Sequence, residues 1–197
     1  MKLTEVVRAL GALGRRGARE AEPPPEPRPS AELTVEAARV EDLPEILRIE
    51  AASFSEPWTP EMFREEFRRP ELATIFIARA PEVAAHLPGA TGGPAGRGPI
   101  VGFLCLSFPA DEGHINNMAV DPRWRRRGVG RALMDRALAF AAARGARVVH
   151  LEVRASNVAA QTIYRGFGFE VTGTRQRYYS RPPEDAFLMQ KSLRRPR

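Results

Sequence analysis

The 197-residue sequence has one cysteine, three histidines and no long apolar run. Cys105 has no second cysteine with which to form a disulfide, and its setting in Gly-Phe-Leu-Cys-Leu is typical of a buried strand, not of a reactive thiol. No stretch approaches the roughly 18 apolar residues of a membrane span. Glu5 and Arg8 interrupt any secretory core near the amino terminus. We therefore expect a cytoplasmic protein.

Several common cofactor motifs are also missing. The sequence has neither the Gly-x-Gly-x-x-Gly of a dinucleotide-binding fold nor the Gly-Lys-Ser/Thr of a nucleotide triphosphatase loop. It offers no aspartate pair or histidine cluster for magnesium or zinc, so we expect no metal. His114 and His150 each fall in a predicted strand with no partner spacing that demands a histidine, which favours a structural role for both.

The composition is that of one soluble globular domain, with 43% hydrophobic and 27% charged residues. The formal net charge of +6 comes almost wholly from arginine. Acidic ligands or partners are therefore plausible, but charge alone does not choose among a nucleotide, a ribosome and a membrane surface.

The chain divides into three parts at about residues 32 and 193. Residues 1–32 have apolar residues at helical spacing from Leu3 to Leu13 and prolines from Pro23 to Pro29, which predicts an amphipathic helix followed by a Pro-rich flexible tether. This extension is either poorly ordered or the product of a start assigned too early, or else it docks on a partner or a membrane. Residues 33–193 form the domain, and 194–197 form a basic tail.

Hydrophobic periodicity and turn residues predict seven strands and four helices in the domain. The strands are expected near 33–35, 73–80, 100–108, 113–120, 147–154, 170–179 and 185–192, and the helices after the capping Asp42, from Thr59-Pro60 to Pro70, over 128–143 and over 157–166.

This order predicts a three-layer α/β fold, with a mixed central sheet of about seven strands and helices on both faces. The helix over 128–143 crosses between the strands 113–120 and 147–154, which a right-handed crossover makes parallel neighbours. Ligands of such sheets bind at the carboxyl ends of parallel strands. The segment 81–99, rich in glycine and proline, reads as a mobile hairpin loop without a catalytic role.

The segment 117–131 carries the clearest ligand signal. A predicted strand ends at Asp121-Pro122, a basic stretch follows, and Gly128 and Gly130 open a helix. Amides at a helix start point outward with the positive end of the dipole behind them, and glycines let an anion approach closely. This pattern predicts a diphosphate site that serves as a cofactor handle. An arginine run by itself is equally typical of a solvated basic face.

This segment resembles a known cofactor loop. Arg125-x-x-Gly128-x-Gly130 is similar to the coenzyme A pyrophosphate loop of the GNAT superfamily of N-acetyltransferases, and 118–122 is similar to the strand before it. The resemblance extends over about residues 33–193 and is sharpest to the ribosomal-protein-alanine N-acetyltransferases, through 54–58, 151–157, the helix ending at Tyr164, 166–169, Tyr178-Tyr179 and 184–186. It implies the three-layer GNAT fold.

The resemblance implies acetyl-coenzyme A as cosubstrate and assigns its contacts. Main-chain groups of Met118, Ala119 and Val120 would bind the acetyl-pantetheine arm as an added strand does. Asn157 lies where the family has a further cofactor contact. A β-carbon at either glycine of the loop would push the cofactor away. The diphosphate would bind the amides of Arg126, Arg127, Gly128, Val129, Gly130 and Arg131.

By the same resemblance, Glu152 is the general base and Tyr164 the general acid. An amine must lose a proton before it attacks a thioester, and the departing thiolate must gain one. At neutral pH, deprotonation costs about 1 to 1.4 kcal/mol for an α-amine and more than about 4 kcal/mol for lysine. A carboxylate base, acting directly or through a water, is therefore sufficient for an α-amine, which favours amino-terminal over lysine acetylation. Tyr178 and Tyr179 would border the peptide groove.

Each assignment has a structural alternative. The strand face that carries Glu152 is either exposed or part of a cleft, and sequence periodicity does not decide between these. The alternative role for Tyr164 is packing in the core as an aromatic residue. The alternative for Tyr178 and Tyr179 is a purely structural pair on an edge strand.

The expected function is transfer of acetyl from acetyl-coenzyme A to a protein α-amine by direct attack in a ternary complex. The resemblance implies, as substrate, a small-subunit ribosomal protein that begins with alanine. Two alternatives stay open: an amino-terminal or lysine acetyltransferase of broader specificity, and a non-catalytic acyl-CoA-binding or ribosome-docking module. The expected reaction requires neither direct contact with nucleic acid nor a membrane span.

Overall fold

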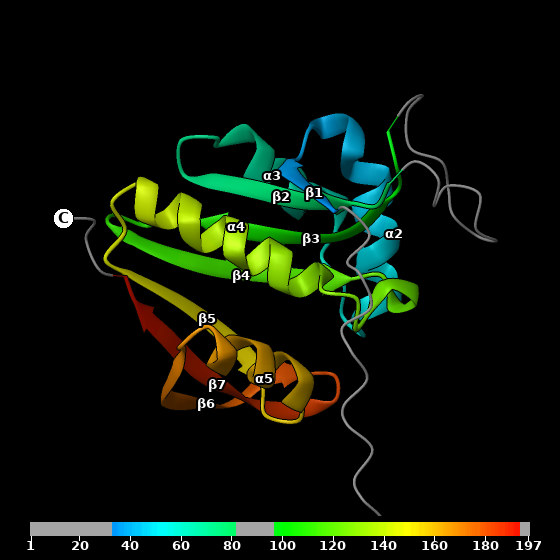
Figure 1. The fold of residues 1–197 in the computed structure, drawn as a ribbon. Helices are drawn as coiled ribbons and strands as arrows, with labels where there is room; N and C mark the ends of the chain where they lie inside the picture. Colours follow the sequence, from blue (N-terminus) through cyan, green and yellow to red (C-terminus); the bar gives the residue numbers. More distant parts are fainter. Residues whose placement is uncertain (1–32, 82–96, 194–197) are drawn as a thin grey trace, which may run out of the picture.

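The computed structural model describes residues 33–81 and 97–193. The predicted helix and tether at 1–32, most of the predicted loop at 81–99 and the basic tail at 194–197 lie outside the described residues. The described chain forms a seven-stranded sheet in the order β1-β2-β3-β4-β5-β7-β6 (Figure 1). The strands are β1 (Thr34–Ala37), β2 (Ala73–Arg79), β3 (Ile100–Ser107), β4 (Glu112–Val120), β5 (Val148–Arg154), β6 (Glu170–Ser180) and β7 (Pro183–Ser192).

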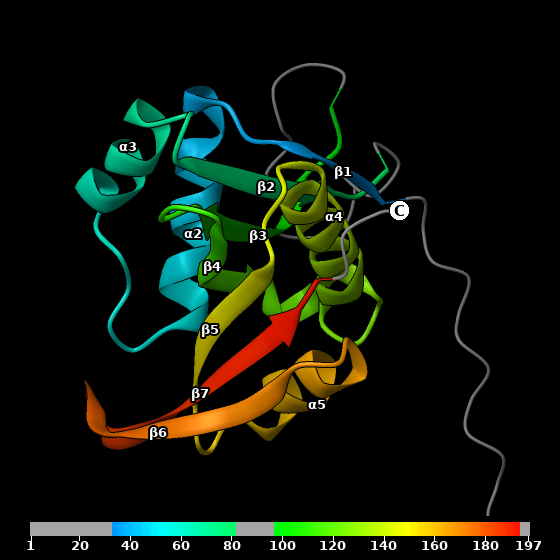
Figure 2. The same cartoon turned by 90° about the vertical axis from the view of Figure 1, so that its left-hand side faces the viewer.

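Helices cover both faces of this sheet (Figure 2). On one face lie α2 (Leu43–Ser53) and α3 (Pro60–Arg68), and on the other lie α4 (Val129–Ala143) and α5 (Val158–Gly166). Two short 3-10 helices, η1 (Val40–Asp42) and η3 (Pro122–Trp124), precede α2 and α4. The mixed three-layer α/β fold predicted from the sequence is confirmed.

Each face of the sheet has its own apolar layer. Ile46 and Phe63, both fully buried, pack from α2 and α3 against residues that include Phe103 of β3. Leu133 of α4 belongs to the layer on the opposite face. Cys105 has no exposed surface, which confirms that it is a core residue.

The two amino-terminal helix starts differ. As expected, Thr59 caps α3: its hydroxyl accepts a hydrogen bond from the Met62 amide at 3.4 Å. Asp42 occupies the N-cap position of α2, as predicted, but its side chain makes no cap hydrogen bond to that helix. The Asp42 carboxylate instead accepts a hydrogen bond from the Arg39 amide and pairs with Arg79, whose buried guanidinium requires a counter-charge.

The pairing of β4 with β5 sets the position of the site. These strands are parallel neighbours joined through α4, as predicted. Their pairing runs from Glu112 opposite Val148 to Ile115 opposite Leu151 and then ends, and the two strands diverge (Figure 1). A shift in the register of β3 with β4 leaves Asn116 with no residue of β3 directly opposite it, although its side chain hydrogen-bonds that of Ser107. The sheet therefore opens at the carboxyl ends of β4 and β5.

Candidate active site

A cavity of about 510 Å³ occupies this opening. Residues of both helical layers reach it, so the cavity is lined from both sides of the sheet. Its lining comes from the end of α2 and the segment after it (Glu50, Ser53–Glu56, Trp58), from β4 (Ile115–Met118), from β5 (Glu152–Arg154), and from Asn157, Ala160, Tyr164 and Tyr179.

Glu152 is the first residue of β5 beyond the paired segment. Its side chain is 15% exposed and lines the cavity, so the strand face left open by the sequence belongs to a cleft. The Nε2 atom of His114 lies 2.7 Å from its Oε2 atom, and the Nη1 atom of Arg175 lies 3.2 Å from its Oε1 atom. Two basic side chains therefore orient this carboxylate.

Tyr164 belongs both to the core and to the cavity. Its ring packs on Phe169 with 6.0 Å between the ring centres, and it also lines the cavity from α5. Burial, assisted by the nearby Tyr179, raises the pKa of the Tyr164 hydroxyl well above its ordinary value. This hydroxyl therefore carries its proton throughout the physiological range.

The structure separates the two adjacent tyrosines of β6. Tyr179 is half-buried and lines the cavity, and burial together with Tyr178 raises the pKa of its hydroxyl to about 12. Tyr178 is 48% exposed and is not among the lining residues. Its ring meets that of Tyr179 edge to face, with 5.1 Å between the centres.

The strand segment expected to bind the pantetheine arm borders the same opening. Met118 lines the cavity, Ala119 packs into the layer beneath α2, and Val120 packs toward α4. Because β5 no longer pairs with β4 beyond Ile115, the main-chain edge of this segment has no strand partner on that side within the described sheet. An extended ligand arm can add there by backbone hydrogen bonds.

The basic loop has the backbone of an anion site. Gly128, at the start of α4, has φ of +83°, and Arg126 also has a positive φ, of +62°. No side chain caps the first turn of α4, so its amides keep their hydrogen-bonding capacity for a ligand. A β-carbon added at Gly130 would lie 3.5 Å from the nearest atom of Ile163, an ordinary contact. Internal packing therefore does not require glycine at 130.

The arginines of this loop are anchored. Arg127 lies over the Trp124 ring at 5.0 Å, and Arg131 lies over the Phe167 ring at 5.4 Å. The Arg123 guanidinium donates to Asp121 at 2.8 Å.

Asn157 has a structural task as well as a place at the cavity. Its side-chain oxygen caps α5 by accepting a hydrogen bond from the Ala160 amide at 3.1 Å, and the residue lines the cavity. A cofactor contact from Asn157 would therefore use its remaining hydrogen-bonding groups.

Sequence reasoning missed a buried polar pair beside the cavity. Glu50, 1% exposed, accepts a hydrogen bond from the Trp58 amide at 2.7 Å and from the Asn117 side chain at 3.1 Å. Burial raises the pKa of Glu50, against the opposing effect of these two donors. The available signal was a glutamate on the inward helix stripe, four residues after Ile46.

The described ranges, 33–81 and 97–193, hold no metal-binding cluster. No three or more histidine, cysteine, aspartate or glutamate side chains in these ranges are arranged to hold a metal ion. No helix of the described chain is both long enough and apolar enough to cross a membrane.

Comparison with known proteins agrees with this geometry. The model of the acetyltransferase (GNAT) family matches residues 43–169. The chain belongs to this family. It is an acetyl-CoA-dependent N-acetyltransferase, and the non-catalytic alternative is set aside.

Relatives within the family carry more specific names. The N-alpha-acetyltransferase RimI of Mycobacterium tuberculosis is 34% identical, over 81% of this chain and 92% of the relative. The ribosomal protein bS18-alanine N-acetyltransferase of Escherichia coli K12 is 29% identical, over 79% of this chain and 95% of the relative. The crystal structure of the E. coli ribosomal-protein-S18-alanine N-acetyltransferase has a TM-score of 0.67 and covers 81% of this chain and 93% of its own.

Proposed function

We propose that this N-acetyltransferase acetylates the α-amine of a protein, and that its substrate is a small-subunit ribosomal protein beginning with alanine. One observation carries the proposal: Glu152 and Tyr164 line a single cavity where β4 and β5 separate. The names of the E. coli and M. tuberculosis relatives support the choice of an α-amine. A ribosomal-protein substrate would place the enzyme in the cytoplasm, so the expected cytoplasmic location is part of this proposal.

Acetyl-CoA supplies the activated acetyl thioester. In the proposal, the amides of residues 126–131 at the start of α4 bind its diphosphate. The free main-chain edge of residues 118–120 holds the acetyl-pantetheine arm, and Asn157 adds a contact at the start of α5. These groups orient the carbonyl toward the cavity that Glu152 lines.

Glu152 and Tyr164 then divide the proton transfers. Glu152 accepts one proton from the substrate ammonium, directly or through a water, and Tyr164 donates one to the leaving sulfur. The second proton that the nitrogen loses on forming the amide restores the Tyr164 hydroxyl. Burial keeps the Tyr164 hydroxyl protonated until that step. Tyr179 borders the bound peptide from inside the cavity, and Tyr178 borders it from the exposed side of β6.

A peptide panel tests the substrate. We expect coenzyme A release from acetyl-CoA with peptides that begin with alanine, and none with the same peptides blocked at the amino terminus. Mass spectrometry of the products locates the acetyl group. Acetylation of lysine in the blocked peptides would contradict the proposal and favour the broader alternative.

The same assay tests the base. We expect Glu152→Gln to lower kcat by about 10² to 10⁴, the usual worth of general acid–base catalysis, because the amide cannot accept the proton. Binding of acetyl-CoA should not change. Unaltered coenzyme A release by this variant would show that Glu152 is not the base.

A further inference from the structure

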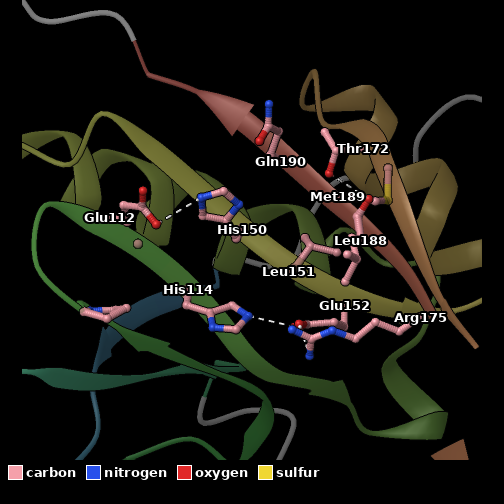
Figure 3. A pocket seen from close by; sticks show the side chains of 12 residues that line it. Glu112, His114, His150, Leu151, Glu152, Thr172, Arg175, Leu188, Met189 and Gln190 are labelled. Atoms are coloured by element: carbon pink, nitrogen blue, oxygen red, sulfur yellow. Dashed lines mark hydrogen bonds and ion pairs between the residues drawn. The ribbon is translucent and has the colours of Figure 1, made fainter. Parts of the chain in front are cut away.

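A second cavity, of about 310 Å³, lies beside the first (Figure 3). Side chains of β4, β5, β6 and β7 line it, among them His114, His150 and Arg175. Glu152 lines both cavities. Its carboxylate therefore lies between the proposed reaction site and the second cavity, which two histidines also line.

His114 connects this carboxylate to the second cavity. Its Nε2 atom is 2.7 Å from Oε2 of Glu152, and its side chain is 33% exposed (Figure 3). Arg175 occupies the other carboxylate oxygen, Oε1, at 3.2 Å. A proton on Oε2 thus has an imidazole nitrogen within hydrogen-bond distance, and that imidazole reaches water.

The reaction requires an exit for one proton. An ammonium and a thioester become an amide, a thiol and one free proton, so each turnover leaves a proton that must reach solvent. Glu152 receives it in the proposed function, and must lose it before the next substrate binds. Of the two side chains that contact the Glu152 carboxylate, only the imidazole of His114 can take on a proton, because the guanidinium of Arg175 has no acceptor atom.

We propose that His114 relays this proton from Glu152 to water in the second cavity. The inference rests on the proposed function. The substrate N–H bond breaks as its proton binds the Glu152 carboxylate. The hydrogen bond between the two side chains then reverses: His114 exchanges its hydrogen from Nε2 to Nδ1 through water, and Nε2 accepts the proton from Oε2. The resulting imidazolium loses a proton to water, and both side chains return to their starting charge.

Four charged or titratable groups share the second cavity with His114: Glu112, His150, Glu152 and Arg175. His150 is directly opposite His114 in the β4–β5 register and is 35% exposed. Its Nε2 atom lies 3.3 Å from Glu112, and neither of these two residues lines the reaction cavity. His150 is therefore a matched control with the same chemistry and exposure, but without contact to Glu152.

The test compares His114→Gln with His150→Gln, using coenzyme A release from an alanine peptide at low buffer concentration. We expect His114→Gln to lower kcat by about ten- to a hundredfold, which is at or below the lower end of the range for general acid–base catalysis, because glutamine cannot pass on the proton. The KM for acetyl-CoA should not change. The pH profile of kcat should differ between the wild type and His114→Gln, because the variant has no titratable group at this position. His150→Gln should match the wild type.

Chemical rescue separates a relay from a merely structural role. Added imidazole should restore kcat of His114→Ala, and should not raise that of the wild type. No rescue, an unchanged pH profile in His114→Gln, or equal losses in both glutamine variants would overturn the relay. Should the His114 variants not fold, a wild-type kcat that does not change with pH would overturn it. A wild type inactive on every peptide would instead refute the proposed function.

Discussion

The guanidinium carbon of Arg154 lies 4.0 Å from the centre of the Tyr179 ring. The Arg154 guanidinium also donates to the carbonyl of Arg181 and to the Glu184 carboxylate, at 3.1 and 3.2 Å. One arginine on β5 thus holds both the tip of the β6–β7 hairpin and the tyrosine that reaches the cavity. Tyr179 is a fixed wall of the proposed peptide site.

We expect Tyr179→Phe to raise the KM for the peptide by about tenfold, the equivalent of one hydrogen bond of about 1.4 kcal/mol, because the phenylalanine keeps the stacked ring but lacks the hydroxyl. The KM for acetyl-CoA should be unaltered. Tyr178→Phe is the matched control on the exposed side and should have little effect. The reverse ranking of the two variants would show that the Tyr178 hydroxyl, and not that of Tyr179, forms the hydrogen bond to the peptide.

Substitution of Tyr164 by phenylalanine should lower kcat by about a hundredfold, the lower end of the range for a general acid, because a thiolate is a comparatively good leaving group. The ring that packs on Phe169 is retained, so thermal unfolding should change little. Steady-state kinetics and calorimetry measure the two effects. A variant with wild-type kcat would show that Tyr164 is not the acid that protonates the leaving sulfur.

Gly130→Ala should separate folding from cofactor binding. The new β-carbon meets Ile163 at 3.5 Å and Val120 at 3.8 Å, both ordinary contacts, and alanine favours a helix over glycine by up to about 1 kcal/mol. We expect equal or higher stability together with at least about tenfold weaker binding of coenzyme A, measured by isothermal titration calorimetry. Unchanged affinity would place the diphosphate elsewhere.

The buried carboxylate of Asp121 makes stability depend on pH. Burial opposes its ionisation, but hydrogen bonds from Arg123 and Arg48 hold its pKa well below the ordinary value of about 3.9. Its contribution is therefore complete above about pH 5 and declines as the pH falls below about 4. We expect Asp121→Asn to lower the free energy of unfolding by about 1 to 3 kcal/mol at pH 7.

Denaturant unfolding of the wild type and Asp121→Asn across pH measures this effect. The difference between the two proteins should shrink steadily in acid below about pH 4, because the unfolded wild-type chain then binds a proton at Asp121 that the folded protein does not. A difference that stays constant down to pH 2 would mean that ionisation of Asp121 does not stabilise the fold.

Elements that depend on local chemistry could be predicted from the sequence. Apolar alternation predicted the strands, Thr59-Pro60 predicted the start of α3, and Gly128 predicted the turn into α4, where the observed φ of +83° is one that glycine adopts without strain. The parallel pairing of β4 with β5 followed from the helix between them. Each of these signals lies within a few neighbouring residues or a single crossover.

Side-chain partners from distant segments could not be predicted in this way. Asp42 reads locally as a helix cap, but the buried Arg79 takes its carboxylate. His114 reads as a lone histidine until the register of two strands brings it to Glu152, 38 residues away.

Taken by itself, the sequence determined the order of strands and helices and the glycine turn into α4, because periodicity and glycine geometry act over short range. Only the tertiary structure decided that β4 and β5 part at Glu152, which tyrosine faces the cavity and which histidine meets the carboxylate. These depend on how separate strands align and where their pairing ends, and no local pattern encodes that alignment.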